Sequence, residues 1–561
     1  ALAGDSEFVT RFFAVWFGVL GVPLVWRVAR DLTPGPSPNR RGEIGMIAAF
    51  LLAINPYQIW HSQDVRNYTL WPALSLLALV FFWEWYDGSR KGRILQNPQA
   101  PQRDTRALVF FVLAELAALY AHYYEAFILL ALNVFVFATL WRERRKLLEW
   151  MGAQIVLAIL YLPYPLLLSN RVSSYGEGSG RYGVALWDVA RETFSAFVLS
   201  DTLDGNLRAW LWIPFALLAL AGLVFLWLRD WKRGLFFISY LGVPTVCVFA
   251  LNTIRPLYLE RYLNGIAPVY YMLIAFGIVG LSDAIQGKHK ALPLHFSFLA
   301  SRLALLIPIA FIASLALANY WTNPAYAKAP NWRGLTDIIN ANAQRGDIIV
   351  QNFPETSLLY YDKTKLPLVV YPETYLPDTE TERQLNAMNA NYQRVWFIPA
   401  AQDFWDPYQF VEQWLDRKDD LLEEWRVGNF NLRLYGTPSY YLNAMRPTNL
   451  TFRNMLALQG YRTEIRGDEL RVVLYWRALN KPDKAYTLKL ETLDAEGNII
   501  SEQISVPVHG AYPMNLWRKN ELVVDQHTLP YSAAVNTFTV SLCDDALCQS
   551  SSGRLPIPRG N

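Results

Sequence analysis

The chain has 561 residues, 53% of them hydrophobic, and a formal net charge of only +3. A charge this close to balance does not indicate a nucleic-acid partner. Residues 1 to about 320 form a series of apolar runs, whereas 321–561 have the composition of soluble sequence. The 21 Trp, 31 Tyr and 30 Phe are typical of a membrane protein with aromatic belts at both interfaces. The first part therefore predicts a multi-pass protein of the cell membrane.

Apolar windows in the first 320 residues predict about ten membrane spans, since a spanning helix needs about 20 mostly apolar residues. The stretch 107–141 is too long for one span, and "AHYYE" (121–125) is expected to divide it into a hairpin. The ten windows are 10–29, 44–60, 69–86, 107–121, 124–141, 150–168, 209–228, 235–251, 265–282 and 302–320. The expected fold class is an α-helical polytopic domain over residues 1–320.

The distribution of Lys and Arg among the loops predicts the orientation of these spans. One set of alternate loops holds 19 Lys or Arg residues, and the other set holds 8. The basic set should face the cytoplasm. The segment 61–68, the long loop 169–208, the segment 252–265 and everything after 320 are therefore expected outside.

The stretch "NPYQIWHSQDVRNYTLWP" (55–72) carries charge beside apolar runs. On a helix, His61 and Asp64 would share a face. Asp64 has the chemistry of a general base or a metal ligand, and Arg66 that of a phosphate-binding group. Tyr68 would anchor the turn by its hydroxyl. An Asp–Arg pair that neutralises itself and caps a helix explains these residues equally well.

The stretch "NTIRPLYLERYLNG" (252–265) places Arg255 and Arg261 on the expected outer side, against the charge bias. Together with Tyr262, these arginines could hold a phosphate at the membrane surface. The alternative is that both side chains extend to lipid headgroups.

The hairpin "LYAHYYEAF" (119–127) contributes His122 and Tyr123 as further candidates for the outer face. A single His among aromatic residues is more often structural than functional, so a supporting role is the stronger expectation.

Three stretches of the sequence, which follow one another in the order of the family, resemble the polytopic membrane glycosyltransferases of the C-type (GT-C) fold. The resemblance is to the bacterial dolichyl-phosphate-mannose–protein mannosyltransferase-like superfamily in particular. Aminoarabinose transferases are among its members. "GDSEFVTRFFAVWFGVLGVPLVWRVARDL" resembles the segment after the first outer loop. "NPYQIWHSQDVRNYTL" resembles the S-Q-E-x-R-x-Y motif, with Asp64 in place of Glu, and "RPLYLERYLNG" resembles a late R-P-x-x-x-x-R-Y-L element.

The resemblance implies a polyprenyl-phosphate sugar as donor and a glycan, lipid or protein as acceptor outside the cytoplasm. It implies that Asp64 supports the acceptor or binds a divalent metal ion. Arg66, Arg255 and Arg261 would then hold the donor phosphate. The family's acidic catalytic motif precedes "GDSEF", so the chain is expected to be a fragment or an inactive copy. An inactive binding or assembly protein, and a transporter or flippase, remain the alternatives.

The second part of the sequence predicts two smaller domains outside the membrane. Residues 321–440 alternate short apolar runs with helical patterns, which is typical of a small α/β domain. Residues 441–561 are dominated by strand patterns, which indicates a β-sandwich that either binds glycan or acts as a spacer. Cys543 and Cys548 would pair in an oxidising compartment, and free thiols are equally consistent with their spacing.

Overall fold

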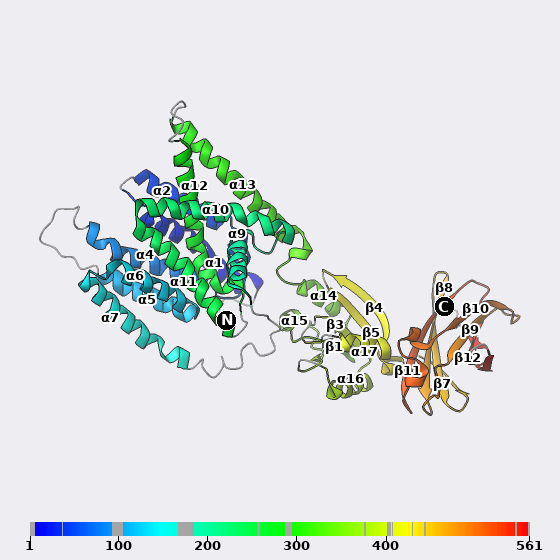
Figure 1. Cartoon of the computed structure of the whole chain (residues 1–561). Coiled ribbons are helices and arrows are strands. Elements are labelled where there is room, and N and C mark those ends of the chain that lie inside the picture. Colours follow the sequence, from blue (N-terminus) through cyan, green and yellow to red (C-terminus); the bar gives the residue numbers. More distant parts are fainter. Residues whose placement is uncertain are drawn as a thin grey trace. The chain divides into compact units, whose positions relative to one another are not determined.

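The structure is a computed structural model of the whole chain. It describes residues 6–35, 38–91, 105–166, 184–254, 258–286, 294–374, 377–400, 405–406, 408–428, 430–441, 445–544 and 547–558. The chain forms two compact units, Ala1–Lys328 and Ala329–Asn561, and each is considered by itself. The first unit is helical and the second contains the sheets (Figure 1). The expected boundaries at 320 and 440 stay predictions.

The helical unit contains a helix at each of the ten predicted windows. Its described helices are α1 (Glu7–Leu32), α2 (Pro38–Ala53), α3 (Pro56–Ser62), α4 (Leu70–Lys91), α5 (Thr105–Ala121), α6 (Glu125–Leu140), α7 (Arg144–Tyr161), α9 (Leu186–Leu199), α10 (Gly205–Arg229), α11 (Trp231–Ile254), the 3-10 helix η1 (Glu260–Ile266), α12 (Ala267–Gln286) and α13 (Leu294–Thr322). Six helical segments in the described residues are long and apolar enough to cross a membrane. The predicted polytopic helical fold is confirmed.

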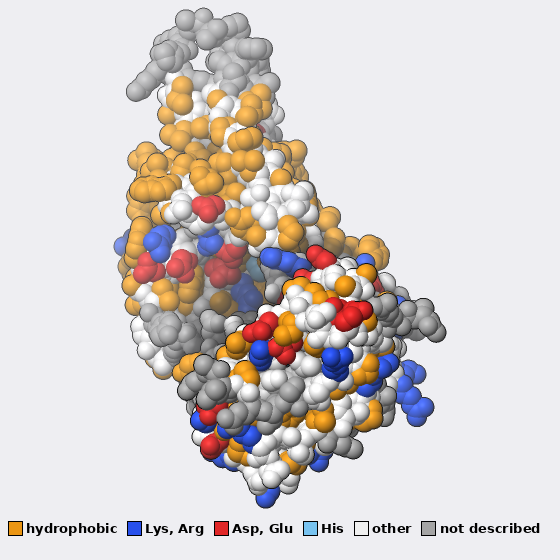
Figure 2. Space-filling model, turned by 90° about the vertical axis from the view of Figure 1, so that its right-hand side faces the viewer, with side chains coloured by type: hydrophobic (Ala, Val, Ile, Leu, Met, Phe, Trp, Pro, Cys, Tyr) orange, Lys and Arg blue, Asp and Glu red, His pale blue; other side chains and the backbone are white. Residues whose placement is uncertain are grey.

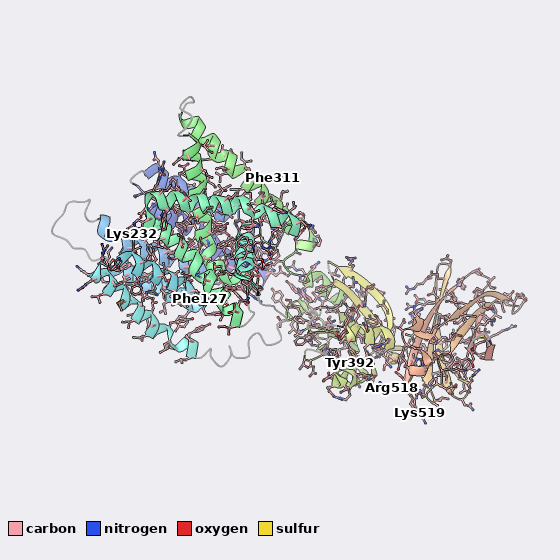
Figure 3. The ribbon with its side chains drawn as sticks, in the orientation of Figure 1. Phe127, Lys232, Phe311, Tyr392, Arg518 and Lys519 are labelled. Atoms are coloured by element: carbon pink, nitrogen blue, oxygen red, sulfur yellow. A yellow bond between two sulfur atoms is a disulfide. The ribbon has the colours of Figure 1, made fainter. Side chains whose placement is uncertain are left out.

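Hydrophobic side chains dominate the surface of this unit on the face shown in Figure 2. Phe311 is an example: it is 63% exposed and projects outward from α13 (Figure 3). Inside the unit, α10 and α12 cross at glycines. A Cβ atom placed on Gly277 would come within 1.9 Å of the Leu218 carbonyl oxygen. Close approach of backbones at small residues is a common way for membrane helices to pack.

The window 44–60 is not one continuous helix. The helix α2 ends at Ala53, and Asn55 caps α3 by accepting a hydrogen bond from the backbone N–H of Gln58 at 3.0 Å. Pro56 occupies the first turn of α3, where it needs no backbone donor. This Asn–Pro signal divides the expected span and begins the short helix that leads to Asp64.

The prediction that 169–208 is one long loop was wrong for its second half. The helix α9 has an amphipathic pattern: Val189, Ala196 and Phe197 are buried, whereas Trp187 is exposed. The buried face of α9 supplies the Phe197 carbonyl oxygen, which accepts a hydrogen bond from Asn55 at 2.8 Å. The first half of this expected loop lies outside the described residues.

The second unit begins with the predicted α/β part, built on one mixed five-stranded sheet. Its strands are β1 (Asp347–Gln351), β2 (Leu368–Val370), β3 (Arg394–Ile398), β4 (Asp420–Val427) and β5 (Phe430–Gly436), in the order β2-β1-β3-β5-β4. The first three strands are parallel, and β5 is antiparallel to its neighbours. The helices are α14 (Trp332–Asn342), α15 (Ser357–Tyr361), α16 (Thr379–Asn391), α17 (Phe410–Lys418) and α18 (Pro438–Tyr441).

The predicted β-sandwich follows, and its two sheets enclose an apolar core that includes Trp476 and Phe538. One sheet has the order β11-β8-β7-β6, and the other has β10-β9-β12-β13 with β14 beside β12. The strands are β6 (Arg446–Phe452), β7 (Leu456–Arg466), β8 (Glu469–Ala478), β9 (Thr487–Leu493), β10 (Ile499–Ser505), β11 (Leu522–Pro530), β12 (Thr537–Asp544), β13 (Leu547–Ser551) and β14 (Leu555–Pro556). Cys543 and Cys548 form a disulfide.

Candidate functional site

The predicted site residues His61 and Asp64 lie together at the end of α3. Asp64 lies in the loop after the helix, and its Oδ2 lies 3.1 Å from Nδ1 of His61. The ring of His61 packs between two tyrosines, with centroid distances of 4.5 Å to Tyr57 and 5.1 Å to Tyr68. The spacing of three residues therefore does bring the carboxylate and the imidazole into contact.

The strongest cationic partner of Asp64 was not predicted from the sequence. Lys328, which follows α13, places its Nζ 2.9 Å from Asp64 Oδ2. It also donates to the carbonyl oxygen of Trp60 and lies 5.3 Å from the centroid of the Trp60 ring. Tyr320 on α13 reinforces this contact by donating to Gln63 Oε1 at 2.8 Å. The segment after α13 is thus fastened to the loop that carries Asp64.

Burial and charge together set the protonation of this group. Burial alone would raise the pKa of Asp64, but the hydrogen bond from His61 and the charge of Lys328 outweigh it, so the pKa is lowered. Burial lowers the pKa of His61, and the nearby charges of Lys328 and Arg261 act in the same direction. At neutral pH Asp64 is therefore an anion and His61 a neutral ring whose Nδ1–H donates to it.

Further cations surround the Asp64–Lys328 pair. Burial lowers the pKa of Lys328, and the charges of Arg11 and Arg66 add to this effect. Arg261, on η1, has its guanidinium carbon 5.7 Å from the centroid of the Tyr68 ring. Its buried Nε has no hydrogen-bond partner among the described residues. Glu260, beside Arg261 on η1, is a second carboxylate of this region. Lys328, Arg11, Arg66 and Arg261 outnumber Asp64 and Glu260, which is an arrangement that favours an anionic ligand.

A second group of predicted residues lies on the hairpin between α5 and α6. The ring of His122 stacks on Trp71 with centroids 4.0 Å apart and on Tyr123 at 5.1 Å. Tyr262 stacks on Tyr124 at 5.1 Å. Burial lowers the pKa of His122 to about 4, so the ring is neutral at physiological pH. These contacts fit the supporting, structural role expected for His122.

The loop of Asp64 and the hairpin of His122 are joined by a side-chain hydrogen bond. The amide of Asn67 donates to the carbonyl oxygen of Ala121. Asn264 lies on η1 together with Arg261 and Tyr262. Its side-chain amide donates to the carbonyl oxygen of Tyr68 at 2.6 Å. The three predicted stretches therefore meet in one region of the helical unit, although Arg255 lies outside the described residues.

An apolar groove of about 420 Å³ lies beside the Asp64 loop, between α1, α2, α3 and α4. Gly18 and Gly21 on α1 and Ala73 on α4 leave room for it. Its polar side chains are Gln58, Ser62 and Thr69, and the last two flank the loop at either end. A chain of hydrocarbon could lie in this groove with its polar head near the cations.

The described residues do not fit a metal site built on Asp64. Where the structure describes the chain, no group of three or more His, Cys, Asp or Glu side chains could hold a metal ion. Oδ2 of Asp64 is already in contact with Lys328 and His61. A cation beside that oxygen would meet the ammonium group of Lys328, so no chemical step is derived through a metal.

Comparisons with known proteins give only distant matches, and no family model and no curated protein matches the sequence. The structure is similar to ArnT from Cupriavidus metallidurans, in the apo state and bound to undecaprenyl phosphate. The match to the apo form has 13% identity and a TM-score of 0.46, and it covers 76% of this chain and 83% of that chain. The match to the bound form has the same identity and TM-score, and it covers 77% of this chain and 85% of that chain. It is also similar to the Archaeoglobus fulgidus oligosaccharyltransferase in complex with Zn and sulfate, at 12% identity and a TM-score of 0.46, over 97% and 86% of the chains. Likenesses this distant do not assign chemistry, which must come from the residues.

Proposed function

We propose that the chain is a membrane glycosyltransferase that moves a sugar from a polyprenyl-phosphate carrier to an acceptor outside the cytoplasm. The observation that carries the proposal is the combination of an apolar groove with a partly buried group of cations around Asp64. A lipid phosphate has matching parts, since its tail needs an apolar surface and its phosphate needs cations. The motif resemblance described above supports the same substrate class.

The proposed reaction forms a bond between an acceptor hydroxyl oxygen and the anomeric carbon of the sugar. The bond from that carbon to the phosphate oxygen breaks, and its electron pair stays on the departing phosphate. Lys328, Arg66 and Arg261 would stabilise this developing charge. Asp64 acts as a positioning residue that holds Lys328 and orients His61. The proton of the acceptor hydroxyl passes to an acidic side chain, a role that the resemblance gives to the acidic catalytic motif of the family.

The direct test is sugar transfer in membranes that contain the full gene product. A synthetic polyprenyl-phosphate donor with a radiolabelled sugar is incubated with an extract of cell-envelope glycolipids, glycans and proteins. Transfer of label to any of these, together with release of polyprenyl phosphate, supports the proposal. Absence of both across donors with several sugars would contradict it.

Replacing Arg261 with Lys is expected to weaken binding of a polyprenyl-phosphate donor about tenfold, with little change in thermal stability. Lysine keeps the charge but loses the planar fork that binds two phosphate oxygens at once. A tenfold loss corresponds to about 1.4 kcal/mol. Affinity is measured with the purified protein in nanodiscs. Arg191→Lys, on the exposed surface of α9, is the matched control. Equal donor affinity in wild type and Arg261→Lys would leave Arg261 as a lipid-headgroup contact.

The second unit is expected to lie outside the cytoplasm. The Lys and Arg distribution in the loops supports this orientation. The disulfide between Cys543 and Cys548 also supports it, since such bonds persist in oxidising compartments. Protease added to intact spheroplasts should therefore cleave within 329–561. Protection of this region, combined with activity of a cytoplasmic reporter at the C-terminus, would overturn the orientation and the proposed reaction.

A further inference from the structure

A polar pocket of about 230 Å³ lies within the second unit, where the α/β part meets the β-sandwich. One wall comes from β4, β5 and α18, and the other comes from β7 and β8. The junction is held by ion pairs between Lys418 and Glu521 and between Arg518 and Glu382, the latter at 3.3 Å (Arg518 is labelled in Figure 3). Both walls therefore belong to one packed body, and binding sites occur preferentially at such junctions.

Strand geometry places a row of charged side chains along one wall. Arg462, Glu464 and Arg466 alternate along β7, so they project from the same face of the sheet. Arg471 on β8 is the register partner of Glu464, directly across the ladder. Guanidinium and carboxylate groups therefore stand side by side on a fixed β-sheet rather than on a loop.

The charges in this pocket balance. Arg394 also lines it, but this arginine is engaged by Asp347 behind the wall through two bonds of 2.9 and 2.7 Å. The remaining charged lining residues are three arginines and three acids: Arg462, Arg466, Arg471, Asp420, Glu423 and Glu464. Without an excess of positive charge, the pocket has no general attraction for phosphate or another anion. It offers donors and acceptors in similar number.

Several of these groups can accept a new partner. Nη2 of Arg471 contacts Asp420 at 2.9 Å and Gln526 at 2.6 Å, but its buried Nε has no hydrogen-bond partner among the described residues. A buried donor without a partner costs free energy, which a ligand oxygen would recover. The Arg466–Glu464 pair, at 2.8 Å, is 57% and 37% exposed, and ion pairs this exposed contribute little, so a ligand can replace them.

We propose that this pocket binds an uncharged, hydroxyl-rich ligand, namely one sugar unit of a glycan. Each hydroxyl group both donates and accepts, and neighbouring hydroxyls match the paired oxygens of a carboxylate and the paired N–H groups of a guanidinium. Tyr440 adds an aromatic ring to the lining, which can cover an apolar face of the sugar. The volume equals that of about eight water molecules, which is room for a single ring. The proposal does not depend on the transfer reaction of the helical unit.

The test is saturation-transfer NMR on the purified full chain in nanodiscs, with the methyl α-glycosides of glucose, mannose and galactose as probes. At least one glycoside should bind, and Glu464→Gln and Arg466→Gln should each weaken its binding at least tenfold. Glu496→Gln, in the exposed turn between β9 and β10, is the matched control and should bind like wild type. Thermal melting confirms that each variant is folded.

Competition with inorganic phosphate separates this proposal from an anion site. Phosphate at equal concentration should not displace the glycoside. Displacement by phosphate, absence of binding by all three glycosides, or equal binding by wild type and both pocket variants would each overturn the proposal. In the last case the bound sugar would belong to another site of the chain, and the pocket would be only a gap between two packed domains.

Discussion

Replacing Asp64 with Asn is expected to slow sugar transfer at least tenfold per folded molecule, which adds about 1.4 kcal/mol to the barrier. Asn has the shape of Asp but lacks the negative charge that holds Lys328 and orients His61. Without this charge the ammonium group of Lys328 loses its anionic partner in a partly buried position and keeps only the Trp60 carbonyl oxygen. The phosphate-stabilising group would then no longer be fixed where the leaving group develops charge. The measurement is transfer from a synthetic polyprenyl-phosphate donor, normalised to folded protein.

A structural role for Asp64 predicts a different result from the same experiment. If the carboxylate only fastens the loop after α3 to the segment after α13, Asp64→Asn should lower the melting temperature and leave turnover per folded molecule unchanged. Asp188→Asn is the matched control, since Asp188 is an exposed acid of α9 that forms an ion pair with Arg191 on the same helix. Wild-type turnover in Asp64→Asn would remove Asp64 from the reaction.

The pH dependence of stability offers an independent check on the Asp64 pair. The pKa of Asp64 is lower in the folded protein than in the unfolded chain, where it is about 3.9. The pair therefore stabilises the fold fully above that value, and this stabilisation is lost as the pH falls through the lower, folded pKa. Asp64→Asn should remove this part of the acid sensitivity whether or not Asp64 takes part in the reaction.

Those contacts of the site that depend on local sequence patterns could be predicted from the sequence. The contact between His61 and Asp64 follows from their spacing at the end of a short helix, and the apolar windows predicted the helices that carry the site. The break between α2 and α3 could have been predicted too, because Asn55 and Pro56 form an ordinary signal for the start of a helix. The hydrophobicity of the window 44–60 obscured this local signal.

The contacts that were missed depend on long-range packing or on unusual strand composition. Nothing near Lys328 in the sequence indicates that α13 returns the chain to Trp60 and Asp64. The one feature of the sequence that could have drawn attention to Lys328 is a positive charge close to the membrane on the expected outer side, where the loops hold few Lys and Arg residues. The strand β7 gives only a weak signal in the sequence, because Arg462, Glu464 and Arg466 interrupt its apolar pattern. These three charged side chains line the polar pocket. The residues that weaken the strand pattern in the sequence are therefore the residues that make the pocket polar.

Replacing Lys328 with Met is expected to reduce the affinity for polyprenyl phosphate about 30-fold, a loss of about 2 kcal/mol. Met keeps most of the length and the apolar stem that packs on Trp60, but it cannot donate to a phosphate oxygen. Only 18% of the Lys328 side chain and 22% of the Asp64 side chain are exposed, so solvent would replace the lost interaction poorly.

The measurement is binding of polyprenyl phosphate to purified protein in nanodiscs at two salt concentrations, because a charged contact also contributes to the salt dependence of binding. Lys328→Arg, which keeps a charged donor, should recover part of the affinity and serves as the matched control. The double variant Asp64→Asn with Lys328→Met should lose less affinity than the sum of the single losses, since each partner acts through the other. If Lys328→Met instead binds polyprenyl phosphate like wild type while melting at a lower temperature, Lys328 only ties the segment after α13 to the loop of Asp64, and the phosphate must be held by the arginines alone.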